Sequence, residues 1–252
     1  MTQTVLITGA ASGMGLSMTK RFLSAEQNIV MADFDASKGQ SLAAKFQTEF
    51  PNQQVDFYQV DVSSPTAVDQ LAKQVLAKYA HIDTLINCAG IFAKGALHEL
   101  TLETWNKVLA VDVTAIFLMT KAFINTMIAQ KSGVIINIAS ISGLYGDYNM
   151  AAYSAAKGAV ANLVRSMALD YGKYNIRVNN IVPGPTNTPL FQQNPPEVIA
   201  KFNQASPLNK IVEPADVANM AYFLASEQAQ AITGQNIQVT AGFGIHSGQP
   251  QQ

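Results

Sequence analysis

The sequence predicts an α/β fold: a doubly wound parallel sheet of seven strands in a single domain. Three observations predict it. Short apolar runs alternate with helical patterns along the chain, apolar residues make up 48% of it, and a glycine-rich turn separates the first apolar run from the first helix. Strands buried on both faces read as continuous apolar runs. A chain of 252 residues is long enough for one such domain.

The apolar runs are the predicted strands. They lie at residues 5–8, 29–33, 55–60, 84–87, 134–139, 176–182 and 236–240. Most of them are rich in Val and Ile, which favour strands. Because helical patterns separate consecutive runs, the strands are expected to pair in parallel through right-handed crossovers.

Helices are expected between these strands. They run from the glycine turn to about residue 26, over 37–50, onward from Ser64-Pro65, over 101–130 and over 151–171. Pro65 suits a first helical position, where its missing N–H would have no partner. The pattern over 101–130 predicts an interruption near Val111.

The domain is placed at residues 1–246, followed by a polar tail at 247–252. Residues 184–214 are rich in proline and too irregular for the core. This segment is therefore predicted to be a substrate loop with short helices over the site.

Composition excludes several classes of protein. The net charge is −1 and there is no basic run, which argues against a nucleic-acid or anionic-membrane partner. The single cysteine, Cys88, excludes an internal disulfide. We find no signal peptide and no apolar run of membrane-spanning length. The expectation is a cytoplasmic protein with a small-molecule substrate.

The glycine turn is predicted to hold a dinucleotide. It follows a strand and opens a helix, which is the context in which backbone N–H groups bind a pyrophosphate. No Gly-Lys-Ser/Thr follows, so the P-loop interpretation fails. The residues assigned to the cofactor here are Gly9, Ser12, Gly13, Met14 and Gly15.

Two carboxylates at strand ends are candidate contacts for the adenosine half. Asp33 ends the second strand, where it can accept hydrogen bonds from ribose hydroxyls and would repel a 2′-phosphate. This favours NAD over NADP as the cofactor. Asp61, with Val62 beside it, is placed to reach the adenine edge.

Asn87, Ala89 and Gly90 follow the fourth strand, where ligands dock on open parallel sheets, and are assigned to the cofactor. Cys88 between them is interpreted as a small buried filler. No metal is assigned, because the three histidines have no ligand spacing. The absence of a Gly-x-Ser-x-Gly elbow removes the α/β-hydrolase interpretation.

Tyr153 and Lys157 are the candidate proton-transfer pair. Four residues apart on a predicted helix, they share one face. A cation about 6 Å from a phenol, at an effective dielectric of about 20, favours the phenolate by roughly 2.8 kcal/mol. Ser140, at the end of the fifth strand, is placed to hydrogen-bond the substrate oxygen. The alternative is that Tyr153 and Lys157 are surface residues of an amphipathic helix and have no catalytic role.

Together these motifs make the chain resemble a short-chain dehydrogenase/reductase of the compact, single-domain type, with a seven-stranded Rossmann sheet. The matching residues are Thr8, Gly9, Gly13, Gly15, Asp61, Asn87, Ala89, Gly90, Ser140, Tyr153, Lys157, Asn179, Pro183, Gly184 and Thr188. The resemblance implies that Tyr153 is the acid/base, that Lys157 assists it and holds the nicotinamide ribose, and that Ser140 positions the substrate. It also implies cofactor contacts at Pro183, Gly184, Thr186 and Thr188, and a homotetramer.

The sequence departs from the family pattern at two places. Asp112 stands where the family has Asn, in a proton relay through the lysine. A carboxylate there is expected to raise the pKa of Lys157 and offset part of its field at Tyr153. The segment Val239-Thr240-Ala241-Gly242 replaces Val-Asp-Gly-Gly, so altered packing or subunit contact is expected there.

The predicted function is NAD-dependent interconversion of a neutral secondary alcohol and its ketone. Around the predicted site the residues are mostly apolar and aromatic, with Lys94 and Asp147 as the obvious charges. Two alternatives stay open: a 3-oxoacyl-[acyl-carrier-protein] reductase, and a non-catalytic NAD-sensing regulator. Fold class alone does not decide the substrate.

Overall fold

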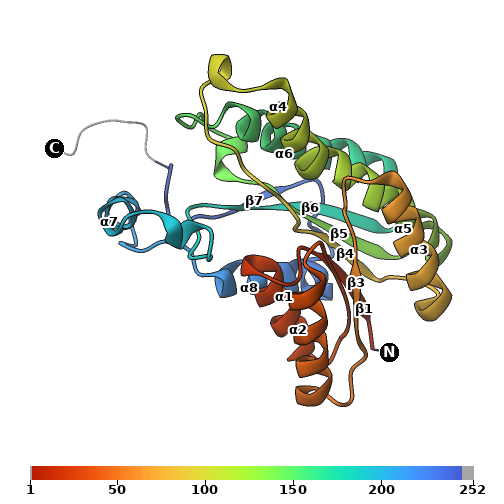
Figure 1. Cartoon of the computed structure of the whole chain (residues 1–252). Coiled ribbons are helices and arrows are strands. Elements are labelled where there is room, and N and C mark those ends of the chain that lie inside the picture. The colour runs from red at the N-terminus through yellow and green to blue at the C-terminus, as the bar shows by residue number, and fades with distance from the viewer. Residues whose placement is uncertain (1, 246–252) are drawn as a thin grey trace.

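The computed structural model describes residues 2–245, and its centre is a seven-stranded parallel sheet (Figure 1). The strand order is β3-β2-β1-β4-β5-β6-β7. The strands are β1 Thr4–Thr8, β2 Asn28–Asp33, β3 Val55–Gln59, β4 Thr84–Asn87, β5 Gly133–Ile138, β6 Ile176–Pro183 and β7 Asn236–Val239. The predicted fold class is confirmed. The predicted tail at 247–252 lies outside the described residues.

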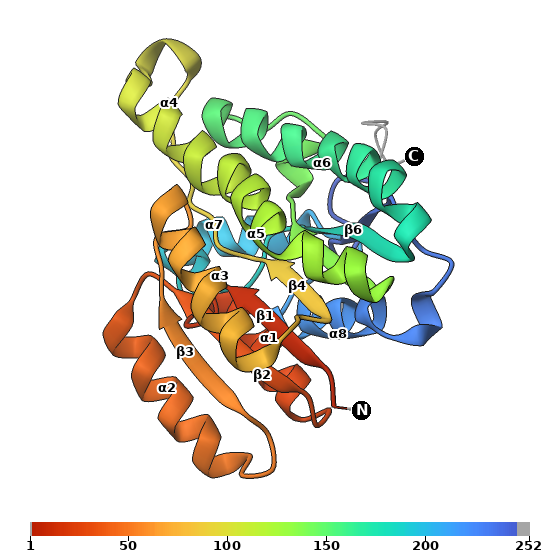
Figure 2. The same cartoon turned by 90° about the vertical axis from the view of Figure 1, so that its right-hand side faces the viewer.

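Helices cover both faces of this sheet. One layer holds α1 Gly13–Leu23, α2 Ala36–Glu49 and α8 Pro214–Ala225; the other holds α3 Pro65–Tyr79, α4 Leu102–Leu109, α5 Ala115–Gln130 and α6 Ala151–Tyr171. Figures 1 and 2 show these layers from two directions, with the short helix α7, Pro196–Gln204, standing apart beyond one end of the sheet.

Alternate residues of each strand enter different layers of the core. Val5 and Ile7 of β1 pack with the cluster that contains Phe22 of α1, whereas Leu6 packs with the cluster that contains Phe123 of α5. Because both faces are covered, strand residues that point to either face are mostly apolar. This is the physical reason why most strands appear in the sequence as nearly continuous apolar runs.

The long helical stretch before β5 is interrupted where the sequence predicts it. A π-helical turn, Ala110–Thr114, separates α4 from α5. The stretch Leu102–Gln130 is also long and apolar enough to cross a membrane by length and composition. Its buried side chains, Met119 and Phe123 among them, pack in the core beside α3 and α6, as those of a core helix do.

Helix α8 was not assigned from the sequence, which predicts only the short helices of residues 184–214 between the sixth and seventh strands. Pro214 occupies its first turn, and the Glu213 amide donates to Asp216 Oδ2 at 2.9 Å. Its buried side chains pack against α1, where Arg21 lies 3.7 Å from the ring centroid of Tyr222. This helix completes the layer of α1 and α2, beside the glycine turn.

A ladder of buried asparagines crosses half of the sheet. Asn87, Asn137, Asn180 and Asn236 are consecutive partners in register on β4 to β7. Along this series, the side-chain amide nitrogen of each of the first three asparagines donates a hydrogen bond to the side-chain oxygen of the asparagine on the next strand, at 2.8 to 3.1 Å. Asn180 also donates to the Val160 carbonyl of α6 at 2.9 Å. The ladder therefore ties α6 to the sheet just beyond Lys157.

Candidate active site

The crevice at the carboxyl ends of β1 and β4 is the point where the chain reverses its direction across the sheet. Ligands bind at such a point in open α/β sheets. Thr8 Oγ1 accepts hydrogen bonds from the amides of Cys88 and Ala89, at 3.0 Å each. Gly9 has φ +67°, and a Cβ there would lie 3.0 Å from Ala89 Cα. The two strand ends are thus joined at this edge.

The glycine turn presents the start of α1 to this crevice. A Cβ on Gly15 would lie 2.0 Å from the Gly9 carbonyl oxygen, so that glycine serves the chain's own packing. Gly13 has φ +49° and faces the Thr188 methyl, 3.4 Å from where its own Cβ would be. Ser12, the N-cap, makes no side-chain capping bond, unlike the caps of α2, α3 and α4.

This helix start fits a pyrophosphate. The first turn of α1 contains no acidic residue, so its N–H groups and the positive end of its dipole meet no anion from their own turn. Anionic phosphates bind at such helix N-termini. Met14, assigned to the cofactor from the sequence, also lines the adjoining cavity.

Asp33 is fixed beside the glycine turn. Its Oδ2 accepts from the Ala11 amide at 2.8 Å and its Oδ1 from the Asp35 amide at 3.0 Å. The carboxylate therefore holds the turn, a role that the sequence analysis did not assign to it. Each oxygen retains capacity for a further donor.

Asp61 is exposed and lies two residues after the end of β3. Its Oδ1 accepts from both the amide and the hydroxyl of Ser63, at 2.9 and 2.6 Å. Val62 beside it is buried in the core cluster under α3. Asn87 is also buried, and its amide nitrogen donates to Asn137, whereas its Oδ1 has no partner among the described residues.

Lys157 is buried at the centre of the predicted catalytic group. Its Nζ donates to the Ile138 carbonyl at 3.0 Å and lies 3.1 Å from Asp112 Oδ2. The same nitrogen lies 5.6 Å from the ring centroid of Tyr153. The i, i+4 spacing on α6 thus places the ammonium behind the phenol, as the sequence predicts.

Asp112 lies in the π-helical turn and forms a buried ion pair with Lys157. Its Oδ1 accepts from the Ile91 amide at 2.8 Å. Gly90 covers the pair: a Cβ on it would lie 3.5 Å from both Asp112 Oδ2 and Lys157 Nζ. Burial lowers the pKa of Lys157, but the carboxylate of Asp112 and the phenol of Tyr153 more than offset it, so the pKa is raised.

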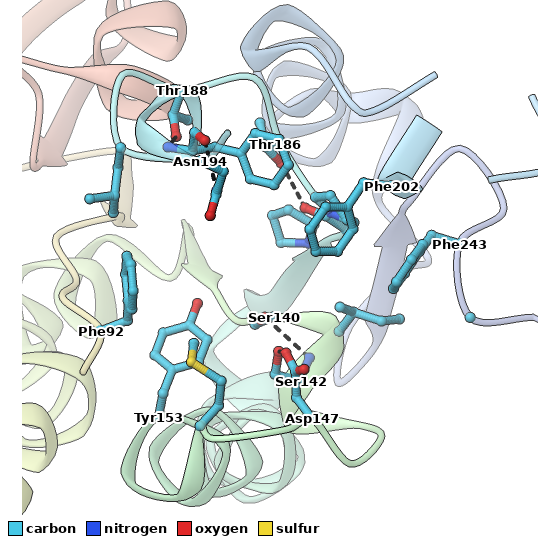
Figure 3. A pocket seen from close by; sticks show the side chains of 18 of the residues that line it. Phe92, Ser140, Ser142, Asp147, Tyr153, Thr186, Thr188, Asn194, Phe202 and Phe243 are labelled. Atoms are coloured by element: carbon cyan, nitrogen blue, oxygen red, sulfur yellow. Dashed lines mark hydrogen bonds between the residues drawn. The ribbon is translucent and has the colours of Figure 1, made fainter. Parts of the chain in front are cut away.

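Ser140 and Tyr153 line the same cavity. Figure 3 shows the Tyr153 hydroxyl pointing into it from α6, with Ser140 beside it on the segment after β5. Ser140 Oγ accepts from the Ser142 amide at 3.2 Å, which leaves its hydroxyl hydrogen to donate elsewhere. The ring of Phe92 packs edge-on to Tyr153, with centroids 6.4 Å apart.

The cavity has a volume of about 910 Å³, enough for a nicotinamide and a small substrate. Apolar and aromatic groups make up most of the wall around Tyr153, and Lys94 and Asp147 also line it. Phe202 of α7 and Phe243 near the C-terminus, 5.9 Å apart by ring centroid, close one side. Sequence reasoning missed both, because no motif marks them and only the tertiary fold brings them to the site.

The segment after β6 forms the opposite wall. Pro183, Gly184, Thr186 and Thr188 all line the cavity. The Thr186 hydroxyl donates to the Gly184 carbonyl at 2.8 Å, and a Cβ on Gly184 would lie 3.0 Å from Thr240 Cα. Of these residues, Thr188 lies against Gly13 of the glycine turn.

The structure gives little support for a cysteine nucleophile or for a metal site. Burial raises the pKa of the Cys88 thiol to about 12, which disfavours the nucleophilic thiolate. Among residues 2–245, no cluster of three or more His, Cys, Asp or Glu side chains is placed to hold a metal ion.

The doubly wound sheet, the uncapped helix at the glycine turn and the Ser-Tyr-Lys group define an oxidoreductase that uses a nicotinamide cofactor. The sequence profile described as "Enoyl-(Acyl carrier protein) reductase" matches residues 9–244. The chain belongs to the short-chain dehydrogenase/reductase family.

Characterised relatives span several substrates. The chain is 36% identical to meso-2,3-butanediol dehydrogenase of Serratia marcescens, over 98% of this chain and 96% of the relative. It is 35% identical to 2,5-dichloro-2,5-cyclohexadiene-1,4-diol dehydrogenase of Sphingobium indicum, over 95% of each. It is 32% identical to a 3-oxoacyl-[acyl-carrier-protein] reductase of Thermotoga maritima, over 95% and 97%.

A similar solved structure contains the cofactor. It is a 7α-hydroxysteroid dehydrogenase in complex with NADH and 7-oxoglycochenodeoxycholic acid, with a TM-score of 0.91 and 29% identity over 96% of this chain and 94% of that one. The family and fold expected from the sequence are thus confirmed.

Proposed function

We propose that this protein is an NAD-dependent oxidoreductase that interconverts a neutral secondary alcohol and its ketone. One observation carries the proposal: the Tyr153 hydroxyl points into a largely apolar cavity, with Ser140 beside it and the Lys157 ammonium behind its ring. The two diol dehydrogenases among the relatives support an alcohol as substrate.

Each catalytic side chain has one task in this proposal. Tyr153 takes the alcohol proton during oxidation and returns it during reduction. Ser140 donates a hydrogen bond to the same oxygen, and Lys157 favours the phenolate by its charge. Asp112 holds Lys157 in place through the buried ion pair. The nicotinamide, when bound, accepts or supplies the hydride.

The cofactor contacts are proposed as the sequence predicts them. The glycine turn and the start of α1 bind the pyrophosphate, and Asp33 binds the adenosine ribose. Asp61 with Val62 lies on the adenine side, Asn87, Ala89 and Gly90 line the crevice, and the loop from Pro183 to Thr188 lies toward the nicotinamide. Asp33 supports NAD over NADP because a 2′-phosphate would meet its carboxylate.

A 3-oxoacyl-[acyl-carrier-protein] reductase is the second candidate, favoured by the Thermotoga maritima relative. Against it stand Asp33, since NADPH is expected for that reaction, and the net charge of −1, which provides no basic surface for an acidic carrier protein. A regulator that only senses NAD would not need a phenol and a serine facing a substrate cavity.

We further propose a cytoplasmic homotetramer whose domain comprises residues 1–246, with 184–214 as the substrate loop. The free thiol of Cys88 suits a reducing compartment. Exposed apolar side chains at Leu102, Phe117 and Leu169, on α4, α5 and α6, support a subunit contact on that layer.

The test is a panel of secondary alcohols and ketones followed at 340 nm with NAD, NADH, NADP and NADPH. We expect turnover of neutral secondary alcohols with NAD and of their ketones with NADH. Higher activity with NADPH than with NADH would contradict the argument from Asp33. Activity restricted to 3-oxoacyl thioesters would favour the carrier-protein reductase, and tight NADH binding without any turnover would favour the regulator.

A further inference from the structure

Asp147 lies in the same short segment as Ser140. The proposed proton transfer by Tyr153 and Lys157 gives it no role. The Ser142 hydroxyl donates to Asp147 Oδ2 at 2.9 Å, while the Ser142 amide donates to Ser140 Oγ at 3.2 Å. Ser142 is itself buried. Two hydrogen bonds through one serine therefore set the position of the carboxylate relative to the serine at the reacting centre.

Asp147 is an exposed residue whose carboxylate lies at the wall of the cavity. Asp147 lines it together with Tyr153 and Ser140, and Figure 3 shows the three on the same side of the opening. Within the described part of the chain, Asp147 Oδ1 has no hydrogen-bond partner and no cation lies within ion-pair distance of it. One oxygen is thus held by Ser142 and the other is available to a ligand.

The chemistry of the Asp147 carboxylate determines which group of a substrate can bind to it. An ionised carboxylate only accepts hydrogen bonds, so a substrate must bring a donor to it. Around it the wall is mainly apolar or aromatic, including Tyr145, Met150 and Phe243. A substrate with an acidic group at this place would be repelled, whereas a hydroxyl would gain a charge-assisted hydrogen bond.

We propose that Asp147 accepts a hydrogen bond from a second hydroxyl of the substrate, so that the preferred substrates are diols and hydroxyketones. The inference rests on the proposed function, because the first hydroxyl or carbonyl is the one that meets Tyr153 and Ser140. Asp147 acts as a specificity-determining residue: it binds the part of the substrate that does not react.

Matched substrate pairs test this proposal: 2,3-butanediol against 2-butanol, trans-1,2-cyclohexanediol against cyclohexanol, and acetoin against 2-butanone. For each pair the ratio of kcat/KM measures the contribution of the second oxygen. We expect the wild type to favour the hydroxylated member at least tenfold in at least one pair. Asp147→Leu should reduce that ratio at least tenfold, with Asp147→Asn between the two.

Two further variants separate specificity from structure. Ser142→Ala removes the hydroxyl that orients Asp147 and should lower the same ratio by a smaller factor. Asp170→Asn, an exposed aspartate at the far end of α6, is the matched control and should leave the ratio unchanged. Thermal shift with NADH verifies that each variant is folded.

The outcomes distinguish this inference from the proposed function. Turnover of the mono-alcohols without any preference for diols, or an equal loss on both members of a pair in Asp147→Leu, would overturn the role of Asp147 alone. Preference for 3-amino-2-butanol over the diol would assign the carboxylate to a cation instead. No turnover of any alcohol or ketone would overturn the proposed function, and this inference with it.

Discussion

Tyr153 is the residue on which the proposed chemistry depends. Tyr153→Phe keeps the ring and its contact with Phe92 but removes the hydroxyl that is proposed to exchange a proton with the substrate oxygen. We expect kcat to fall by about 10³-fold, within the range for loss of a general acid or base. NADH affinity, measured by fluorescence titration, should change little. Retention of more than a tenth of the activity would contradict the assignment.

Asp112 is the residue at which this chain departs from its family within the site. Asp112→Asn introduces the side chain that the family has at this position, and its amide oxygen can still accept the hydrogen bond from the Ile91 amide. Activity should therefore be retained or improved. A loss of a hundredfold or more would show that the carboxylate has a catalytic role of its own. The measurement is kcat/KM on the best alcohol.

The same substitution should change the dependence of stability on pH. The pKa of Lys157 is raised above its ordinary value of 10.5, so the ion pair stabilises the fold below pH 10.5 and loses this effect as pH rises through the folded-state pKa. In Asp112→Asn, burial of Lys157 is no longer offset by the carboxylate. Scanning calorimetry should therefore show that the Tm of Asp112→Asn falls below the wild-type Tm by the largest amount near neutral pH. This difference in Tm should shrink above pH 10.

At the scale of elements, the asparagine ladder joins β4 to β7 and holds α6. Asn180→Leu removes three hydrogen bonds and leaves the amide nitrogen of Asn137 and the amide oxygen of Asn236 without those partners. Buried unpaired groups cost about 1–3 kcal/mol each, so we expect a loss of about 3 kcal/mol in urea unfolding. Asn106→Ala on exposed α4 is the control; an equal effect of the two would refute the ladder.

The segment after β7 contains the other departure from the family. Ala241 has φ +53°, the left-handed region in which an alanine is strained, and the adjoining Gly242 has φ +85°. Ala241→Gly should relieve the strain and raise the free energy of unfolding by about 1 kcal/mol. The measurement is Tm and urea midpoint. A decrease would mean that the alanine methyl makes a packing contact of greater value.

At the scale of the whole molecule, the exposed apolar residues of the α4–α5–α6 layer predict assembly. Multi-angle light scattering after size exclusion should give four times the chain mass of 27.0 kDa. Phe117→Glu places a charge on α5 without touching the cavity, and should shift the mass to a smaller species while circular dichroism stays unchanged. A wild-type monomer would contradict the proposed tetramer.

Local patterns in the sequence were sufficient for the fold class and for the core of the candidate site. Continuous apolar runs determined the parallel sheet, because both of its faces are covered. The spacing of Tyr153 and Lys157 determined their common face, since helix geometry is local. The glycine turn predicted the helix start that the structure leaves without a side-chain cap.

Only the tertiary structure decided the features that depend on distant segments. The asparagine ladder across four strands and the closure of the cavity by Phe202 and Phe243 each join residues far apart in the chain. Helix α8 belongs here too, because packing on α1 completes its burial. The physical reason is the same throughout: a periodic pattern records how one segment folds, whereas a side chain's partner is set by which segments the sheet brings together.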